Sequence, residues 1–139
     1  MEKNFVITGG GSIGKRHLKN LISLNIDKEN IFVLEPREDR VSEIKSLGIN
    51  NCLKDIREFD DISIKAAIIC SPTSYHIDQA IYFANKKADL MIEKPLSRDL
   101  LNIDKLKDIV SKNKLVTFIA YIFRFAPSIK YLKEILMVE

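Results

Sequence analysis

The chain has 139 residues, of which 46% are hydrophobic and 29% charged, and a formal net charge of +3. This composition predicts one soluble globular domain with a real core, and the mild, dispersed charge argues against a nucleic-acid-binding surface. No apolar stretch approaches membrane-spanning length, and the N-terminus lacks the apolar core of a signal peptide. The two cysteines form neither a metal-binding spacing nor a disulfide framework, so we expect a cytoplasmic protein without a bound metal.

Short apolar runs alternate with segments of helical periodicity along the whole chain. Strands are predicted near residues 3–8, 30–35, 51–53, 66–70, 89–93 and 115–121, and helices near 12–25, 37–47, 73–86, 98–112 and 127–137. Runs such as residues 66–70 are apolar on both faces, as a sheet covered by helices requires. The alternation predicts an α/β fold with a doubly wound, mostly parallel sheet and helices on both faces.

The first predicted strand runs into a glycine-rich turn that contains the pattern G-x-G-x-x-G, formed by Gly9, Gly11 and Gly14. A strand before this pattern and a helix after it are typical of a dinucleotide-binding loop. In such a loop Gly9 permits the tight turn, Gly11 lets the backbone approach a pyrophosphate, and Gly14 lets the helix pack close to the strand. The free N–H groups at the start of the helix would hold the phosphates.

An acidic residue, Glu35, ends the second predicted strand, about 20 residues beyond the last glycine of the pattern. A carboxylate at this place binds the hydroxyls of the adenosine ribose and repels a 2′-phosphate, which favours NAD as the cofactor. Arg37 follows two residues later and could instead pair with that phosphate. NADP therefore stays open as the alternative cofactor.

A second loop leaves the fourth predicted strand and contains Ser71, Pro72, Thr73 and His76. One interpretation is a loop that touches the nicotinamide half of the cofactor. The other is a simple turn in which Thr73 caps the following helix and His76 lies in its first turn. The residues themselves leave both interpretations open.

A third loop, with Glu93, Lys94 and Pro95, follows the fifth predicted strand. Pro95 favours an extended conformation at Lys94 and permits a cis peptide bond between them. An ammonium held at this sheet edge could donate a hydrogen bond to a substrate oxygen or transfer a proton. The alternative is an ordinary loop lysine that faces solvent. Elsewhere, Cys70 is expected to be a small buried residue, and Gly48 the left-handed residue after a helix.

Four motifs in chain order resemble the glucose–fructose oxidoreductase / inositol dehydrogenase (Gfo/Idh/MocA) family. They are G-x-G-x-I-G-x-x-H at residues 9–17, S-P-T-x-x-H-x-x-x-A at 71–80, E-K-P-L at 93–96 and Y-x-x-R-F-x-P at 121–127. The resemblance implies a Rossmann domain that binds NAD or NADP. It also implies hydride transfer between nicotinamide and a carbinol of a sugar, inositol or related polyol.

The resemblance also assigns roles to single residues. Lys94 would be catalytic and lie beside the nicotinamide and the substrate, with its backbone held by its two neighbours. The cofactor-binding residues would be Gly9, Gly11, Ser12, Ile13, Gly14, Glu35, Arg37, Ser71, Pro72, Thr73, His76, Glu93 and Lys94. His17 would be mainly structural, and Tyr121, Arg124 and Phe125 would lead toward the substrate.

Members of the family are more than twice as long as this chain and carry a second domain for the substrate. The resemblance therefore places the cofactor domain in residues 1–126 and the start of a connection in residues 127–139. We expect little activity from this chain alone, and neither the substrate nor the oligomeric state follows from the sequence. Two alternative functions are a non-catalytic nucleotide-binding sensor or scaffold, and a methyltransferase with a similar glycine loop.

Overall fold

The computed structural model describes residues 4–136 of the chain. The strands are β1 (Asn4–Thr8), β2 (Ile31–Leu34), β3 (Asn51–Leu53), β4 (Ile64–Ile69), β5 (Asp89–Ile92) and β6 (Thr117–Ile119). The α-helices are α1 (Ser12–Ser23), α2 (Glu38–Ser46), α3 (His76–Asn85), α4 (Ile103–Asn113) and α5 (Pro127–Leu136). Four short 3₁₀ turns complete the described part: η1 (Lys28–Asn30), η2 (Ile56–Phe59), η3 (Thr73–Tyr75) and η4 (Ile122–Phe125).

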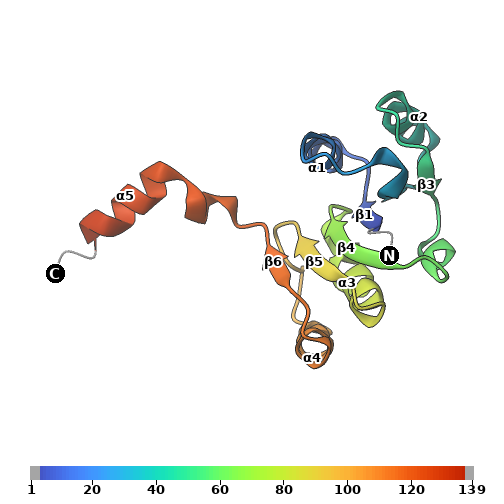
Figure 1. Ribbon diagram of the computed structural model, residues 1–139. Coiled ribbons are helices and arrows are strands. Elements are labelled where there is room, and N and C mark those ends of the chain that lie inside the picture. Colours follow the sequence, from blue (N-terminus) through green and yellow to red (C-terminus); the bar gives the residue numbers. More distant parts are fainter. Residues whose placement is uncertain (1–3, 137–139) are drawn as a thin grey trace.

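All six strands form one parallel sheet in the order β3-β2-β1-β4-β5-β6. Helices α1 and α2 cover one face of the sheet, and α3 and α4 cover the other (Figure 1). The predicted doubly wound sheet is therefore confirmed. Because the strand order reverses between β1 and β4, the carboxyl ends of these strands border the crevice where such sheets bind their ligands.

Two layers of apolar side chains hold the helices on the sheet. Successive residues of a strand point to opposite faces, so Val6 packs under α3 and α4 whereas Ile7 packs under α1 and α2. On the first face, Phe59 and Phe83 are fully buried and meet edge to face, with ring centroids 5.5 Å apart. The strands are apolar on both faces because each face packs against its own pair of helices.

The largest difference from the predicted boundaries is at the start of α4. Helix α4 begins at Ile103 rather than near residue 98, because a hydrogen bond within residues 99–101 and a left-handed residue at 102 hold the preceding segment in a non-helical turn. The Asp99 carboxylate accepts a hydrogen bond from the Leu101 N–H at 2.8 Å, and Asn102 takes a left-handed conformation with φ of 61°. Strand β6 is limited to residues 117–119 of the predicted 115–121.

The end of α2 follows the prediction. Gly48 has φ of +85°, and its N–H donates to the Lys45 carbonyl oxygen at 2.9 Å. A residue with a Cβ adopts this left-handed conformation only at a cost, so glycine is the natural residue after the helix.

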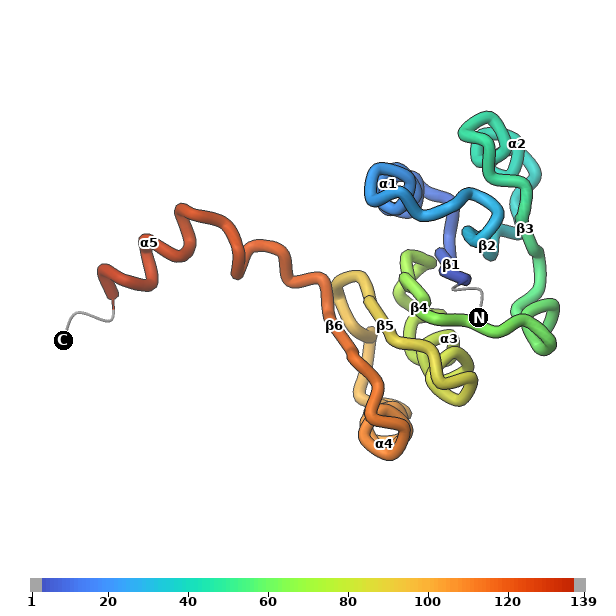
Figure 2. The backbone as a smooth tube through the Cα atoms, in the orientation of Figure 1, coloured from blue at the N-terminus to red at the C-terminus, as the bar shows by residue number. Residues whose placement is uncertain are grey.

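The C-terminal segment stands apart from the rest of the fold. Turn η4 and helix α5 project away from the sheet as an arm (Figures 1 and 2), and the main contacts of α5 are with η4. The apolar side chains of the helix are exposed, from 43% at Ile129 to 72% at Leu136. Among residues 4–136 no helix combines the length and the apolar composition that crossing a membrane requires.

Asp89, at the start of β5, forms an ion pair with Lys65 of β4. Its carboxylate accepts hydrogen bonds from Lys65 Nζ at 2.6 Å and from the Val116 N–H at 3.0 Å. The bond from Lys65 is the main cause that holds the pKa of Asp89 below its ordinary value of 3.8. A carboxyl with a lowered pKa stabilises the fold above its unfolded-state pKa, and this contribution is lost as the pH falls through the folded-state pKa.

We therefore expect the free energy of unfolding of the wild type to fall more steeply between about pH 5 and pH 3 than that of Asp89→Asn. Urea denaturation across this pH range measures the two slopes. Asp108→Asn, on an exposed position of α4, is the matched control and should keep the wild-type slope. Equal slopes for wild type and Asp89→Asn would contradict this account.

Candidate cofactor site

The turn after β1 needs glycine at two positions. Gly9 has φ of +87°, and its N–H donates to the Leu34 carbonyl oxygen of β2 at 2.9 Å. A Cβ on Gly9 would lie 2.8 Å from the Cys70 carbonyl oxygen, and a Cβ on Gly14 would lie 1.9 Å from the Gly9 carbonyl oxygen. The tight turn and the close approach of α1 that the sequence predicted are both present.

The middle glycine of the pattern, Gly11, faces open space. A Cβ on Gly11 would meet only Arg40 Nη1, at 3.9 Å. Gly11 is also the N-cap of α1, where no side chain accepts a hydrogen bond from the helix, and the first bond to its carbonyl comes from the Lys15 N–H at 2.9 Å. The N–H groups of the first turn therefore have no intrahelical acceptors, which is the arrangement that binds a phosphate.

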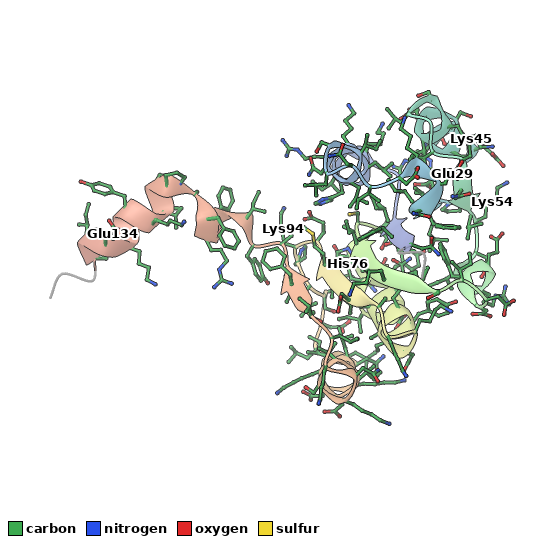
Figure 3. The ribbon with its side chains drawn as sticks, in the orientation of Figure 1. Glu29, Lys45, Lys54, His76, Lys94 and Glu134 are labelled. Carbon is green, nitrogen blue, oxygen red and sulfur yellow. The ribbon has the colours of Figure 1, made fainter. Side chains whose placement is uncertain are left out.

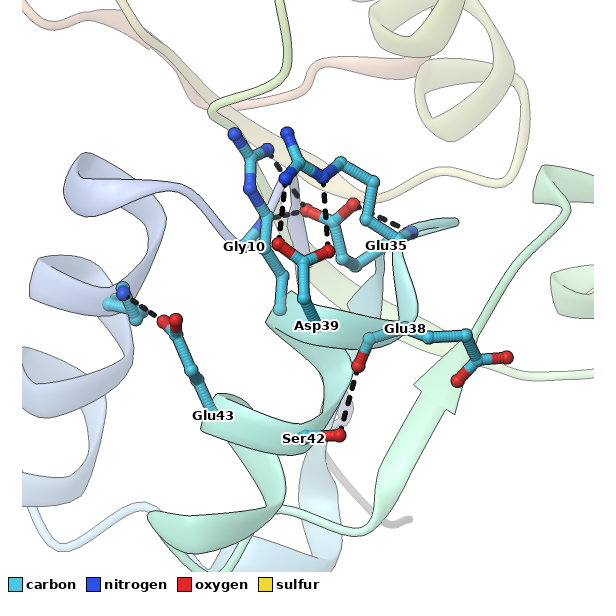
Figure 4. Close-up of polar contacts among 9 residues, drawn as sticks. Gly10, Glu35, Glu38, Asp39, Ser42 and Glu43 are labelled. Carbon is cyan, nitrogen blue, oxygen red and sulfur yellow. Dashed lines mark hydrogen bonds and ion pairs between the residues drawn. The ribbon is translucent and has the colours of Figure 1, made fainter.

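Glu35 is fixed at the end of β2, beside this turn (Figure 4). Its side chain is buried, with an exposed fraction of 2%. One carboxylate oxygen accepts the Gly10 N–H at 2.7 Å, and the other accepts the Arg37 N–H at 3.0 Å. The carboxylate is thus held in place by the backbone on both sides before any ligand binds.

Two arginines follow Glu35, and the structure gives them different surroundings. The guanidinium of Arg37 is bound to Asp39, with nitrogen–oxygen distances of 3.1 and 2.6 Å, and it holds the pKa of Asp39 below its ordinary value. Arg40 Nη1 lies 3.4 Å from the Glu35 carboxylate and near Gly11. Of these two arginines, Arg40 is therefore the one placed beside Glu35 and Gly11. It was not predicted from the sequence, although it lies in the first turn of the helix after Glu35.

A cavity of about 410 Å³ opens beside Glu35. It brings together five of the residues predicted from the sequence: Gly9, Glu35, Arg37, Ser71 and Pro72. Arg40, Tyr75 and Gln79 line it as well and were not predicted. The Ser71 hydroxyl donates to Gln79 Oε1 at 2.7 Å, which ties the loop after β4 to α3.

The remaining predicted residues lie outside this cavity. Ser12 lines a separate open pocket between α1 and α2, and Ile13 is half-buried against the core of that face. Thr73 lies in turn η3 and makes no capping hydrogen bond with α3, so its predicted role as N-cap is wrong. The helix starts three residues later because Pro72 and the 3₁₀ turn occupy the place of the first helical turn.

Lys94 lies in the loop after β5, at the same carboxyl edge of the sheet. The Glu93 N–H donates to the Ile69 carbonyl oxygen of β4 at 2.9 Å, and the Lys94–Pro95 peptide bond is cis, as the sequence permitted. The Lys94 side chain is exposed, and none of the ion pairs among residues 4–136 includes it. Figure 3 shows it on the side of the domain from which the arm departs.

Both histidines of the chain are buried and bound to protein groups. His76 is the first residue of α3, and its ring nitrogens lie 2.9 Å from the Pro95 carbonyl oxygen and 2.8 Å from that of Ser71. His17 on α1 lies with its Nε2 2.9 Å from Glu93 Oε1. The His76 ring thus faces main-chain carbonyls rather than the cavity, although it was predicted to be a cofactor-binding residue.

These features agree with the comparison to known families. The model of the Gfo/Idh/MocA family, described as an oxidoreductase family with an NAD-binding Rossmann fold, matches residues 3–121. The chain belongs to this family. It is therefore an NAD-binding Rossmann domain, as the motifs predicted.

Two curated relatives of this chain are inositol dehydrogenases. Myo-inositol 2-dehydrogenase of Thermotoga maritima is 33% identical over 130 residues, which are 92% of this chain and 39% of that protein. The NAD⁺-dependent scyllo-inositol 2-dehydrogenase of Bacillus subtilis is 29% identical over 88% of this chain and 36% of that protein. The chain thus spans less than half the length of either relative.

A solved structure of the same fold is that of a probable dehydrogenase from Thermotoga maritima. It superposes with a TM-score of 0.82 and 31% identity over 96% of this chain and 40% of that one. The agreement covers nearly the whole of this Gfo/Idh/MocA domain.

The fourth motif of the Gfo/Idh/MocA resemblance lies at the base of the arm. Tyr121 and Phe125 are exposed by 52% and 55%, and the Arg124 guanidinium lies 5.8 Å from the centre of the Phe125 ring. Phe125 also packs against Phe118 of β6, with ring centroids 6.1 Å apart. These residues join the arm to the edge strand of the sheet.

Cys70 is buried at the end of β4, as expected for a structural thiol. Burial, together with the nearby charge of Glu93, raises the pKa of Cys70 to about 12. Burial also raises the pKa of Cys52, although this thiol is only half-buried. Because the thiolate is the reactive form, we expect iodoacetamide at pH 7 to label Cys52 faster than Cys70 in the folded chain. Peptide mass spectrometry measures both, urea-unfolded protein provides the control in which both react, and equal labelling in the folded chain would contradict the expectation.

Proposed function

We propose that this chain is the cofactor-binding part of an NAD-dependent dehydrogenase that moves hydride between nicotinamide and a carbinol of inositol, a sugar or a related polyol. The observation that carries the proposal is the shared position of three features. The glycine turn, Glu35 and Lys94 follow β1, β2 and β5 at one carboxyl edge of the sheet. The two curated relatives described above are inositol dehydrogenases, which supports inositol or a related polyol as the substrate.

The described residues would contact the parts of the dinucleotide in order along this edge. Glu35 would bind the hydroxyls of the adenosine ribose from its fixed position. The open face of Gly11 and the uncapped start of α1, with Ser12, Ile13 and Gly14, would hold the pyrophosphate. The loops of Ser71 and Lys94 would line the nicotinamide half.

Lys94 is the residue that we assign to the chemistry. When bound, NAD supplies the acceptor for a hydride. The exposed ammonium of Lys94 can donate a hydrogen bond to a substrate carbonyl oxygen, and its neutral amine can accept the proton of a substrate hydroxyl. Its neighbour Glu93 is bonded to His17, so the carboxylate nearest in sequence is already engaged.

We also propose a boundary between the cofactor domain and the arm at residue 126. Turn η4 ends at Phe125, and α5 makes its main contacts with that turn rather than with the sheet. The exposed apolar face of α5 would then face the part of the enzyme that holds the substrate. Residues 137–139 lie outside the described structure.

Calorimetric titration of the chain with NADH, NADPH and ADP-ribose tests the proposal. We expect NADH to bind more tightly than NADPH, because Glu35 repels a 2′-phosphate. NADH should also bind more tightly than ADP-ribose if the loops of Ser71 and Lys94 contact the nicotinamide. S-adenosylmethionine is the negative control, and a folded chain that binds neither NADH nor NADPH would overturn the proposal.

A further inference from the structure

The chain contains two histidines, and both act on the residues that flank Lys94. They come from different helices on opposite faces of the sheet, His17 from α1 and His76 from α3. Their exposed fractions are 9% and 2%. His17 is bonded to Glu93, and His76 is bonded to Pro95.

His17 holds the residue before Lys94. Its Nε2 lies 2.9 Å from Glu93 Oε1, and the two side chains are exposed by only 11% and 13%. The other carboxylate oxygen of Glu93 accepts the Lys94 N–H at 3.2 Å. The helix that follows the glycine turn is thus linked through one carboxylate to the backbone of Lys94.

His76 holds the residue after Lys94. Its Nδ1 lies 2.9 Å from the Pro95 carbonyl oxygen, and its Nε2 lies 2.8 Å from the Ser71 carbonyl oxygen. A carbonyl oxygen only accepts and a neutral imidazole carries a single N–H, so a neutral ring donates to one of these two carbonyls at a time, and both bonds together require a proton on each ring nitrogen. The buried ring therefore connects the Lys94 loop to the loop after β4.

We propose that His17 and His76 are positioning residues that hold the backbone of Lys94 from both sides. The proposal rests on the proposed function in one respect, namely that Lys94 acts on the substrate. Lys94 itself is exposed, and among the described residues the polar backbone bonds of Lys94 and Pro95 run to Glu93 and His76. A side chain on an exposed loop keeps a defined position only when its backbone is fixed by such partners.

Variants of His76 can separate its two bonds. The amide nitrogen of asparagine is as many bonds from Cβ as Nδ1, and that of glutamine is as many as Nε2. The His76→Asn variant is therefore expected to keep the bond to Pro95, whereas His76→Gln keeps only the bond to Ser71. For His17, His17→Gln keeps a donor at the Nε2 position and His17→Leu removes it.

Hydrogen exchange of the Lys94 and Leu96 amides, measured by NMR on the chain without cofactor, tests the proposal. We expect exchange about five- to tenfold faster in His76→Gln and His17→Leu, the effect of one lost hydrogen bond on local opening. His76→Asn and His17→Gln should stay within about twofold of wild type. Tyr82→Phe removes a different side-chain bond of α3, to Asp60 at 2.6 Å, and should leave both amides unchanged.

Two results would overturn the proposal: equal exchange in His76→Asn and His76→Gln, or an acceleration that spreads evenly over β1 and α1. Thermal unfolding of each variant identifies a general loss of stability, and the pair of His76 variants decides the question even if His17→Leu does not fold. The measurement uses no cofactor. Failure to bind NADH would therefore reject the proposed function while leaving this result standing.

Discussion

Replacing Gly14 by alanine is expected to destabilise the domain and to abolish cofactor binding at once. The added Cβ would lie 1.9 Å from the Gly9 carbonyl oxygen, so the helix or the turn must move. The turn has little freedom to move, because the Gly9 N–H is bonded to Leu34 and the Cys70 carbonyl leaves no room beside Gly9. Overpacking costs about 1–3 kcal/mol and occasionally more, which urea denaturation measures directly.

Gly11→Ala is the matched control for this effect, because the same methyl group is added three residues earlier. Its Cβ would meet only Arg40 Nη1 at 3.9 Å, so the free energy of unfolding should stay within about 0.5 kcal/mol of wild type. NADH affinity should nevertheless fall at least about tenfold, since the methyl group occupies the open approach to the backbone. Wild-type stability of Gly14→Ala, or wild-type NADH affinity of Gly11→Ala, would contradict the assigned roles of these glycines.

Replacing Glu35 by alanine is expected to weaken NADH binding by roughly 10- to 100-fold, the effect of losing one hydrogen bond to a charged group. The same change removes the negative charge that repels a 2′-phosphate and releases Arg40, whose Nη1 lies 3.4 Å from that carboxylate. The preference for NADH over NADPH should therefore fall at least about tenfold. Paired titrations with NADH and NADPH give the ratio.

Two further variants separate the arginines. Adding Arg40→Ala to Glu35→Ala should remove any gain in NADPH affinity, because the Arg40 guanidinium lies next to the position from which Glu35→Ala removes the carboxylate. Arg37→Ala should change the ratio little, because the Arg37 side chain is 58% exposed and its guanidinium is bound to Asp39. Two results together would show that Arg37, rather than Arg40, contacts the 2′-phosphate. These are a loss of NADPH binding in Arg37→Ala, and no loss of NADPH binding when Arg40→Ala is added to Glu35→Ala.

The elements that follow from local chemistry could be predicted from the sequence. Apolar runs bounded by glycine and proline located the six strands, and the positive φ of Gly48 could be expected from its place after a helical stretch. The start of α4 could not, since it depends on the left-handed Asn102 and on a bond within the preceding loop. Nothing in the periodicity of residues 98–102 distinguishes that loop from a helical turn.

Within the site, residue types were predictable but partners were not. The glycine pattern, Glu35 and Lys94 could be found because each directly follows an apolar run that predicts a strand. The pairing of Arg37 with its neighbour Asp39, which leaves Arg40 beside Glu35, depends on how α2 leaves the sheet. The bonds that the two histidines make to the Lys94 loop join residues that are 76 and 19 positions apart, and such distant contacts appear only once the chain is folded.

Helix α5 has ten residues, and its apolar side chains are covered by little of the described domain. A helix of this length is marginal in water, because its own hydrogen bonds barely offset the cost of nucleating it. Burial of Ile129, Leu132 and Leu136 against another surface would therefore stabilise the helix. The folding of α5 would then be thermodynamically linked to the burial of these three side chains, so the helicity of α5 would report whether such a surface is present.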